Sequence, residues 1–149
     1  MKPKQRTIPT ISPTKNEAVT ISPERSQPVR YDKPSTDRLL TYVTTKTPQS
    51  DEDTQVKETL LKSIGYQSAV VNNTSSYRIE YIRSADQFMV EIKDINVGKA
   101  KQDVVIWFSS KGFSQHAICT MPVVFYLNSV TAQELEPLHI SFSQLADGC

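Results

Sequence analysis

Apolar and polar side chains alternate along most of residues 77–92, which read YRIEYIRSADQFMVEI. This period of two predicts two β-strands joined by a loop over residues 83–86. The loop would set Ile82 opposite Gln87, and one face would then pair Tyr81 with Phe88, Ile79 with Val90, and Tyr77 with Ile92. On the other face Arg78 meets Glu91 and Glu80 meets Met89. We therefore expect a hairpin with one apolar and one polar face.

Two segments carry the longer period of an α-helix. In SDEDTQVKETLLKSIG, apolar side chains recur at helical spacing from Val56 to Ile64, Ser50 can cap the start, and Gly65 suits the position after the end. In the second helix, which begins after Asn96, the apolar positions are Ala100, Val104, Trp107 and Phe108. Gly112 followed by Phe113 is typical of a Schellman end. We expect this second helix to cover the apolar face of the hairpin, with Trp107 packed on Ile79, Tyr81 and Val90.

The last third of the chain predicts shorter elements. Ser114 can cap one helical turn that ends at Cys119, and PVVFYLN then reads as a strand with Pro122 at its first position. Thr131 and Glu134 match a capping box and predict a short turn. LHISF follows as a candidate extra edge strand.

The order of these elements, α-β-β-α-β, predicts an α+β fold. It would have a small, open-faced antiparallel or mixed sheet with helices on one face, as in half of a split β-α-β plait. A right-handed crossover through the second helix should place the third strand beside the first. The expected core consists of Ile79, Tyr81, Phe88, Val90, Ile92, Val104, Trp107, Phe108 and Phe125.

Composition divides the chain into two parts. Residues 1–48 hold most of the nine prolines and no Phe, Trp or Cys, with nine Lys and Arg against four Asp and Glu, a net charge of +5. Residues 49–149 have eight basic and twelve acidic side chains, a net charge of −4. Residues 1–34 are therefore expected to be a disordered, basic, Pro/Ser/Thr-rich linker. Residues 35–149 would form one small domain, with one or two helical turns starting at Ser35 or Thr36.

The cysteines offer the clearest candidate chemistry. Cys119 and Cys149 could be unrelated thiols, a metal pair or a disulfide. The strand after Cys119 runs away from it and LHISF can run back, which favours a disulfide in an oxidising compartment. His116 and His139 complete neither a four-ligand zinc set nor a nucleophilic pair with an oxyanion hole. No metal, cofactor or catalytic site is predicted.

Other functional sites find little support in the sequence. Glu80, Asp86 and Glu91 fit a solvated face and a turn better than acid–base chemistry. The glycines form no phosphate-binding loop. RNA could stack on an open sheet, but Tyr77, Tyr81 and Phe88 should be covered by the helices, which leaves Tyr126 as the aromatic residue of the open face. Nucleic acid is therefore a disfavoured partner.

Several motifs, including IEYIRSADQFMVEI, QHAIC, PVVFYLN and the terminal FSQLADGC, suggest a relationship over roughly residues 40–149. In these motifs the chain resembles an uncharacterised family of short surface proteins from uncultured candidate-phyla bacteria. The resemblance implies a domain held outside the membrane by an N-terminal apolar anchor and a Pro/Thr-rich spacer. It supplies no catalytic residues. This chain keeps the spacer but not the anchor, so the resemblance implies either a missing start or a cytoplasmic member.

Three hypotheses of function follow. The first is a non-enzymatic extracytoplasmic structural or interaction module on a flexible stalk, whose partner is an unknown protein or a cell-surface polymer. The alternative is a cytoplasmic nucleic-acid-binding plait domain, which applies if the chain start is genuine. An enzyme is a third and weaker hypothesis, because no convergent polar cluster is apparent. No apolar run in the sequence reaches the ~18 residues that span a membrane.

Overall fold

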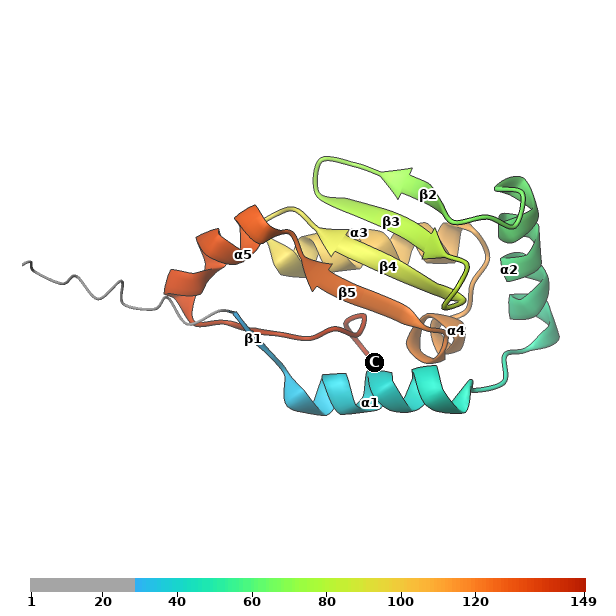
Figure 1. Ribbon diagram of the computed structural model, residues 1–149, viewed down its shortest axis with the longest axis horizontal. Coiled ribbons are helices and arrows are strands. Elements are labelled where there is room, and N and C mark those ends of the chain that lie inside the picture. The colour runs from blue at the N-terminus through green and yellow to red at the C-terminus, as the bar shows by residue number, and fades with distance from the viewer. Residues whose placement is uncertain (1–28) are drawn as a thin grey trace, which may run out of the picture.

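A four-stranded mixed sheet is the central feature of residues 29–149, the part of the chain that this computed structural model describes (Figure 1). Its strands are β2 (Ala69–Asn73), β3 (Tyr77–Ile82), β4 (Gln87–Ile92) and β5 (Val123–Leu127), in that spatial order. The first three are antiparallel, and β5 runs parallel to β4. The predicted α+β fold with a small mixed sheet is therefore confirmed.

The β3–β4 hairpin has the predicted register. Tyr77 lies opposite Ile92, Ile79 opposite Val90, and Tyr81 opposite Phe88. All six of these side chains are at most 6% exposed. On the open face Arg78 and Glu91 are also opposite each other, but the guanidinium of Arg78 pairs with Glu80 at 3.3 Å instead. The alternation of apolar and polar residues thus predicts the register of the two strands, but it does not predict which charged side chains form an ion pair.

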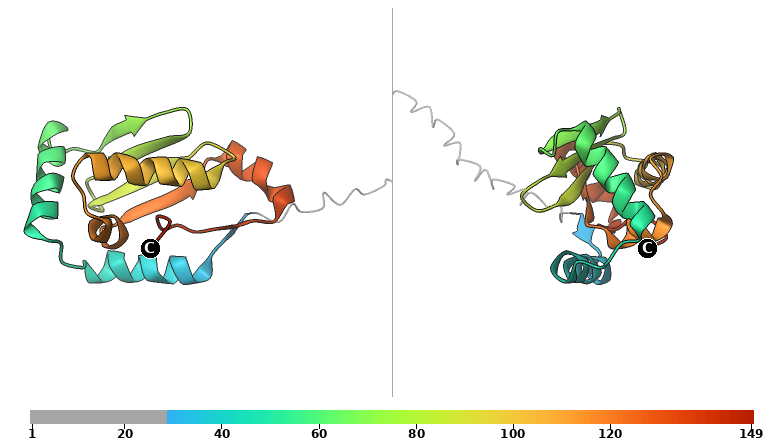
Figure 2. Two further views of the ribbon diagram at one scale, coloured as in Figure 1. Left: turned by 180° about the vertical axis from the view of Figure 1, so that it is seen from behind. Right: turned by 90° about the vertical axis from the view of Figure 1, so that its right-hand side faces the viewer.

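Helix α3 (Val97–Ser110) covers the apolar face of the sheet, as the view from behind shows (Figure 2). The side chain of Asn96 accepts a hydrogen bond from the Lys99 N–H at 3.2 Å and caps the helix as predicted. At the other end the Phe113 N–H bonds to the Phe108 carbonyl, and Gly112 has φ +103°. These features form the predicted Schellman end.

The expected core is buried with one exception. Ile79, Phe88, Val90, Ile92, Val104, Phe108 and Phe125 are fully buried and Tyr81 is 4% exposed, but Trp107 is only partly buried. Phe108 contacts the hairpin, with its ring 5.3 Å from that of Phe88. Trp107 packs on the flank of Phe108 and against the margin of the core. Val104 and Phe108 are thus the most deeply buried positions of the helix, and the predicted contacts of Trp107 with Ile79, Tyr81 and Val90 stay a prediction.

The strand order differs from the predicted one. The prediction placed PVVFYLN beside the first hairpin strand, whereas β5 lies beside β4, the second. The reason is β2, which the sequence did not reveal and which occupies the outer edge of β3. Because β2 already pairs with this edge of β3, β5 pairs with the other edge of the hairpin, which is β4. The unit β4-α3-β5 is accordingly a plain parallel β-α-β crossover, not half of a split plait.

Regular secondary structure is present within the segment predicted to be a linker. Strand β1 (Arg30–Tyr31) pairs in parallel with β6 (Ser141–Phe142), and helix α1 (Lys33–Thr45) follows at once. The prediction places residues 29–34 in the linker, whereas Val29 is buried and α1 is longer than the predicted one or two turns. Asp32 caps it by accepting a hydrogen bond from the Ser35 N–H. The rest of the predicted linker, residues 1–28, lies outside the described residues.

The remaining helices lie around the rim of the sheet (Figure 1). Ser50 caps α2 (Asp51–Ser63) and Ser114 caps α4 (Gln115–Thr120), both as predicted. Helix α5 (Ser129–Leu135) starts from Asn128 and leads into η1 (Glu136–Leu138). Thr131, predicted to cap a turn, is instead buried inside α5. The predicted edge strand LHISF is reduced to β6, outside the main sheet.

No helix within residues 29–149 is long and apolar enough to cross a lipid bilayer.

Candidate functional site

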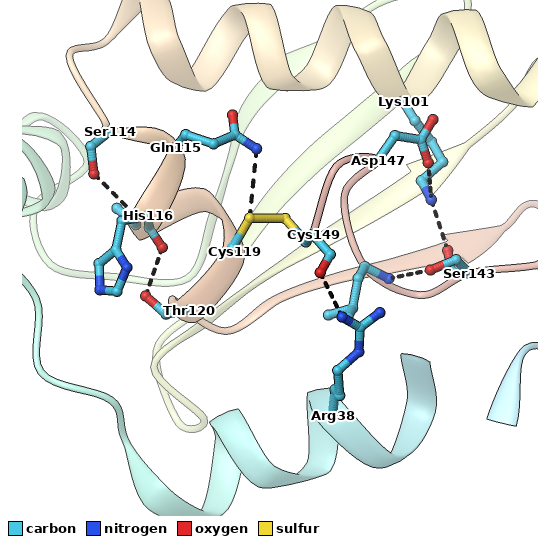
Figure 3. Close-up of a disulfide and its surroundings, with 12 residues drawn as sticks. Arg38, Lys101, Ser114, Gln115, His116, Cys119, Thr120, Ser143, Asp147 and Cys149 are labelled. Atoms are coloured by element: carbon cyan, nitrogen blue, oxygen red, sulfur yellow. Dashed lines mark hydrogen bonds and ion pairs between the residues drawn. A yellow bond between two sulfur atoms is a disulfide. The ribbon is translucent and has the colours of Figure 1, made fainter. Parts of the chain in front are cut away.

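Cys119 and Cys149 form a disulfide, which confirms the predicted pairing (Figure 3). Cys119 lies in the last turn of α4, and Cys149 is the last residue of the chain. Their Cα atoms are 5.3 Å apart, within the usual range for such bridges. The cross-link therefore joins the end of α4 to residues 139–149, here called the C-terminal segment.

The C-terminal segment runs back between β5 and α1 (Figure 1). The Phe125 N–H of β5 donates to the Gln144 carbonyl at 3.0 Å, and the Thr36 hydroxyl of α1 donates to the Gln144 side chain at 2.9 Å. Arg38 of α1 donates to the carbonyl of Cys149 (Figure 3). The predicted return of the chain toward Cys119 is thus made by a largely irregular segment.

Lys101 of α3 also holds the C-terminal segment. This residue is only 2% exposed, and its ammonium donates to the Ser143 carbonyl at 3.0 Å and pairs with Asp147 at 2.9 Å. The same ammonium lies over the rings of Phe125 and Phe142. Sequence reasoning missed Lys101, although its spacing from Val104 and Phe108 places it on the buried face of the helix.

Asp53 is a second buried polar residue that the sequence did not reveal. Its carboxylate accepts hydrogen bonds from the Ser114 N–H at 2.7 Å, the Ser114 hydroxyl at 2.6 Å and the Ser50 hydroxyl at 2.9 Å. Burial alone would raise the pKa of Asp53. The bonds from Ser114 and Ser50, with the nearby His116, outweigh burial and lower this pKa below its usual value. Asp53 therefore joins the start of α2 to the start of α4 as an ionised group.

Asp86, a candidate acid–base residue in the sequence, stabilises the hairpin loop. It pairs with Lys57 at 2.7 Å and accepts a hydrogen bond from the Tyr81 hydroxyl at 2.8 Å. Burial tends to raise the pKa of Asp86, but the Lys57 and Tyr81 bonds lower it overall. Burial and the bond to Asp86 raise the pKa of Tyr81 to about 12. Both groups therefore keep their usual protonation states at neutral pH.

The other candidate residues do not converge with Asp86. Glu80 and Glu91 lie on the open face of the sheet, where Glu80 contacts Arg78 and Glu91 accepts a hydrogen bond from Asn128 at 2.8 Å. His116 and His139 are exposed, on α4 and just after η1. Within residues 29–149, no three His, Cys, Asp or Glu side chains come together as a metal site would require.

The open face carries charged side chains and one aromatic ring. Tyr77, Tyr81 and Phe88 are buried on the covered face, as predicted, and Phe125 joins them. Of the aromatic residues in β2–β5, Tyr126 alone is on the open face, opposite Glu91. Burial, followed by the negative charge of Glu91, raises the pKa of Tyr126. The open face therefore combines charged side chains with one neutral phenol.

No family model, curated protein or solved structure matches the chain. The inference of function therefore depends on the side chains just described.

Proposed function

We propose that this protein is a non-enzymatic interaction module that works outside the cytoplasm, with an unknown protein or a cell-surface polymer as its partner. The observation that carries this proposal is the Cys119–Cys149 bridge. Disulfides persist in oxidising compartments and are rare in the cytosol. The resemblance to short surface proteins of candidate-phyla bacteria supports the same location.

The way the disulfide is built into the fold adds support. Besides the bridge, the C-terminal segment is contacted by Lys101, by Arg38 and by β5, and these contacts favour the approach of Cys149 to Cys119. A bridge formed under these conditions adds stability without rearranging the fold. This is the behaviour of a structural disulfide in a small exported domain.

The assignment as non-enzymatic is supported by the ionisable groups that are buried or have a shifted pKa, because each of them makes structural contacts. Active sites concentrate shifted pKa values in one pocket. Here the two carboxyl groups with lowered pKa values lie apart, because Asp53 joins α2 to α4 and Asp86 closes the hairpin loop. The buried ammonium of Lys101 lies elsewhere and anchors the C-terminal segment. Each of the three groups has structural partners.

The test is to trap the thiol state in the cells that make the protein. Cells would be quenched in acid, alkylated under denaturing conditions, and analysed by peptide mass spectrometry without reduction. We expect the peptides containing Cys119 and Cys149 to be linked. We also expect an impermeant protease added to intact cells to digest the protein. Alkylated free thiols together with protease resistance would contradict the proposal and favour the cytoplasmic nucleic-acid-binding alternative.

A further inference from the structure

A pocket of about 420 Å³ opens between the β2–β3 turn and the outer face of α3. The turn contributes Thr74, Ser75, Ser76 and the adjoining Tyr77, and α3 contributes Asp103, Ile106, Trp107 and Ser110. Two aromatic side chains therefore share a small volume with several hydroxyl groups and one carboxylate. The pocket is shallow and open to solvent, and it combines apolar surface with a few polar groups, as ligand sites do.

Trp107 is the central residue of this pocket. It is the single tryptophan of the chain, and it is only partly buried although it belongs to the helix that covers the sheet. Its indole N–H has no hydrogen-bond acceptor among residues 29–149. Buried or half-buried tryptophan usually finds a partner for this group. The pocket thus offers an indole ring that Lys111 approaches from one side at 5.4 Å, with an unused donor at its edge.

The wall opposite Trp107 is pre-organised. The Thr74 hydroxyl accepts hydrogen bonds from the N–H groups of Ser76 and Tyr77, and Lys93 donates to the Thr74 carbonyl and the Asn73 side chain. Asn72 donates to the Tyr77 hydroxyl at 2.9 Å. A wall fixed in this way loses little conformational entropy when a ligand enters.

The charges around the pocket select the type of ligand. Asp103 is the acidic lining residue, and no Lys or Arg is among the described lining residues. Two lysines lie beside the pocket, because Lys99 pairs with Asp103 at 2.7 Å and Lys111 lies over the Trp107 ring at 5.4 Å. These contacts compensate the charge of Asp103 and engage both lysines, so neither a cation nor an anion would meet an uncompensated charge. A neutral ligand rich in hydroxyl groups fits what remains.

From this geometry we infer that the pocket binds a neutral saccharide. The C–H face of one pyranose ring would pack on Trp107, and its hydroxyls would donate to the free carboxylate oxygen of Asp103 and exchange hydrogen bonds with Ser75 and Ser110. The inference rests on the proposed function and specifies its polymer partner. It concerns binding and not hydrolysis, because glycosidases use a pair of carboxyl groups and Asp103 is the one carboxylate among the described lining residues.

The single tryptophan makes a direct test available. Purified, oxidised full-length protein would be titrated with neutral hexasaccharides of β-1,4-linked glucose, β-1,4-linked N-acetylglucosamine and α-1,4-linked glucose while Trp107 fluorescence is recorded. We expect at least one of them to shift the emission in a saturable manner. Polygalacturonate and tetramethylammonium serve as anionic and cationic probes, and we expect neither to bind.

Variants measured by calorimetry and saturation-transfer NMR complete the test. Trp107→Ala should weaken binding of the active hexasaccharide about tenfold or more, the loss typical of a central aromatic contact. Trp107→Phe and Asp103→Asn keep the fold and should weaken it severalfold. Tyr126→Ala, which removes an aromatic ring from the open face, is the matched control and should bind like the parent.

Failure of all three neutral hexasaccharides to bind, or equal binding by the parent and Trp107→Ala, would overturn the inference. Binding of tetramethylammonium or polygalacturonate in place of the saccharides would also overturn it. Because these measurements use purified protein, such a failure leaves the thiol-trapping result standing. A negative sugar test is therefore distinguishable from a wrong location.

Discussion

The ammonium of Lys101 lies 2.9 Å from the carboxylate of Asp147, although the two side chains differ greatly in exposure. The Lys101 side chain is 3% exposed and that of Asp147 is 58% exposed. The charge of Lys101 is therefore compensated from the surface, while its aliphatic part and its bond to Ser143 are inside the fold. This arrangement makes Lys101 a structural contact and Asp147 a largely solvated partner.

Replacing Lys101 should therefore cost much more stability than replacing Asp147. Lys101→Ala removes packing between Phe125 and Phe142 and leaves the Ser143 carbonyl without its donor, a loss of about 2–4 kcal/mol. Lys101→Met keeps the packing but also leaves the Ser143 carbonyl without its donor, so it should cost about 1–3 kcal/mol and less than Lys101→Ala. Asp147→Asn should cost less than about 1 kcal/mol. Urea unfolding measures all three, and equal losses for Lys101→Ala and Asp147→Asn would contradict this assignment.

The difference in burial between Phe108 and Trp107 gives a second prediction. Phe108 is fully buried and contacts Phe88, so Phe108→Ala should cost about 3–5 kcal/mol. Trp107 lies on the flank and lines the pocket, so Trp107→Ala should cost roughly 1–2 kcal/mol, in the range of ordinary substitutions. Thermal denaturation of both variants is the measurement. A greater loss for Trp107→Ala would show that the helix faces are reversed.

Local patterns predicted much of this fold because they depend on neighbouring residues. The hairpin register follows from alternation between Tyr77 and Ile92, and the helix ends follow from Asn96, Gly112 and Phe113. Each of these signals is complete within a few residues of sequence. The predictions from these signals were correct because the local preference and the tertiary packing agree.

Features that depend on distant partners could not be predicted in this way. Strand β2 is short, and its register shifts between Val70 and Asn72, so it lacks clean alternation. Yet it occupies the edge of β3 and thereby decides where β5 must pair. The two residues of β1 pair with β6 at the far end of the chain, and no local pattern reveals such a contact. The disulfide was predictable because the chain has two cysteines, whereas the pocket at Trp107 depends on the unpredicted β2–β3 turn.

Asp53 predicts how stability depends on pH. Its pKa in the folded protein is lowered below the unfolded value of about 3.9. Its contribution is therefore fully present above about pH 4 and is lost as the pH falls through the folded pKa. At pH 7, Asp53→Asn should cost about 1–3 kcal/mol, because it weakens hydrogen bonds to a charged acceptor.

The control for Asp53 is the same comparison at low pH. The difference in unfolding free energy between the parent and Asp53→Asn should shrink as the pH falls below 4. Asp86 also has a lowered pKa and is present in both proteins, so its effect cancels in the difference. A difference that stays constant down to acid unfolding would show that the charge of Asp53 does not matter.

Removing the disulfide should lower stability without releasing the C-terminal segment. The bridge joins residues separated by 30 positions, and the chain-entropy model gives roughly 3–4 kcal/mol for a loop of this length. The double variant Cys119→Ser/Cys149→Ser should show this loss in urea unfolding, and the reduced parent should match it. Lys101 and Arg38 still hold the segment in the folded state. Amide exchange of the Phe125 N–H, which donates to the Gln144 carbonyl, should accordingly remain slow at pH 7 in the double variant. Fast exchange of this N–H in a variant that is otherwise folded would mean that the bridge, and not Lys101, holds the segment against β5.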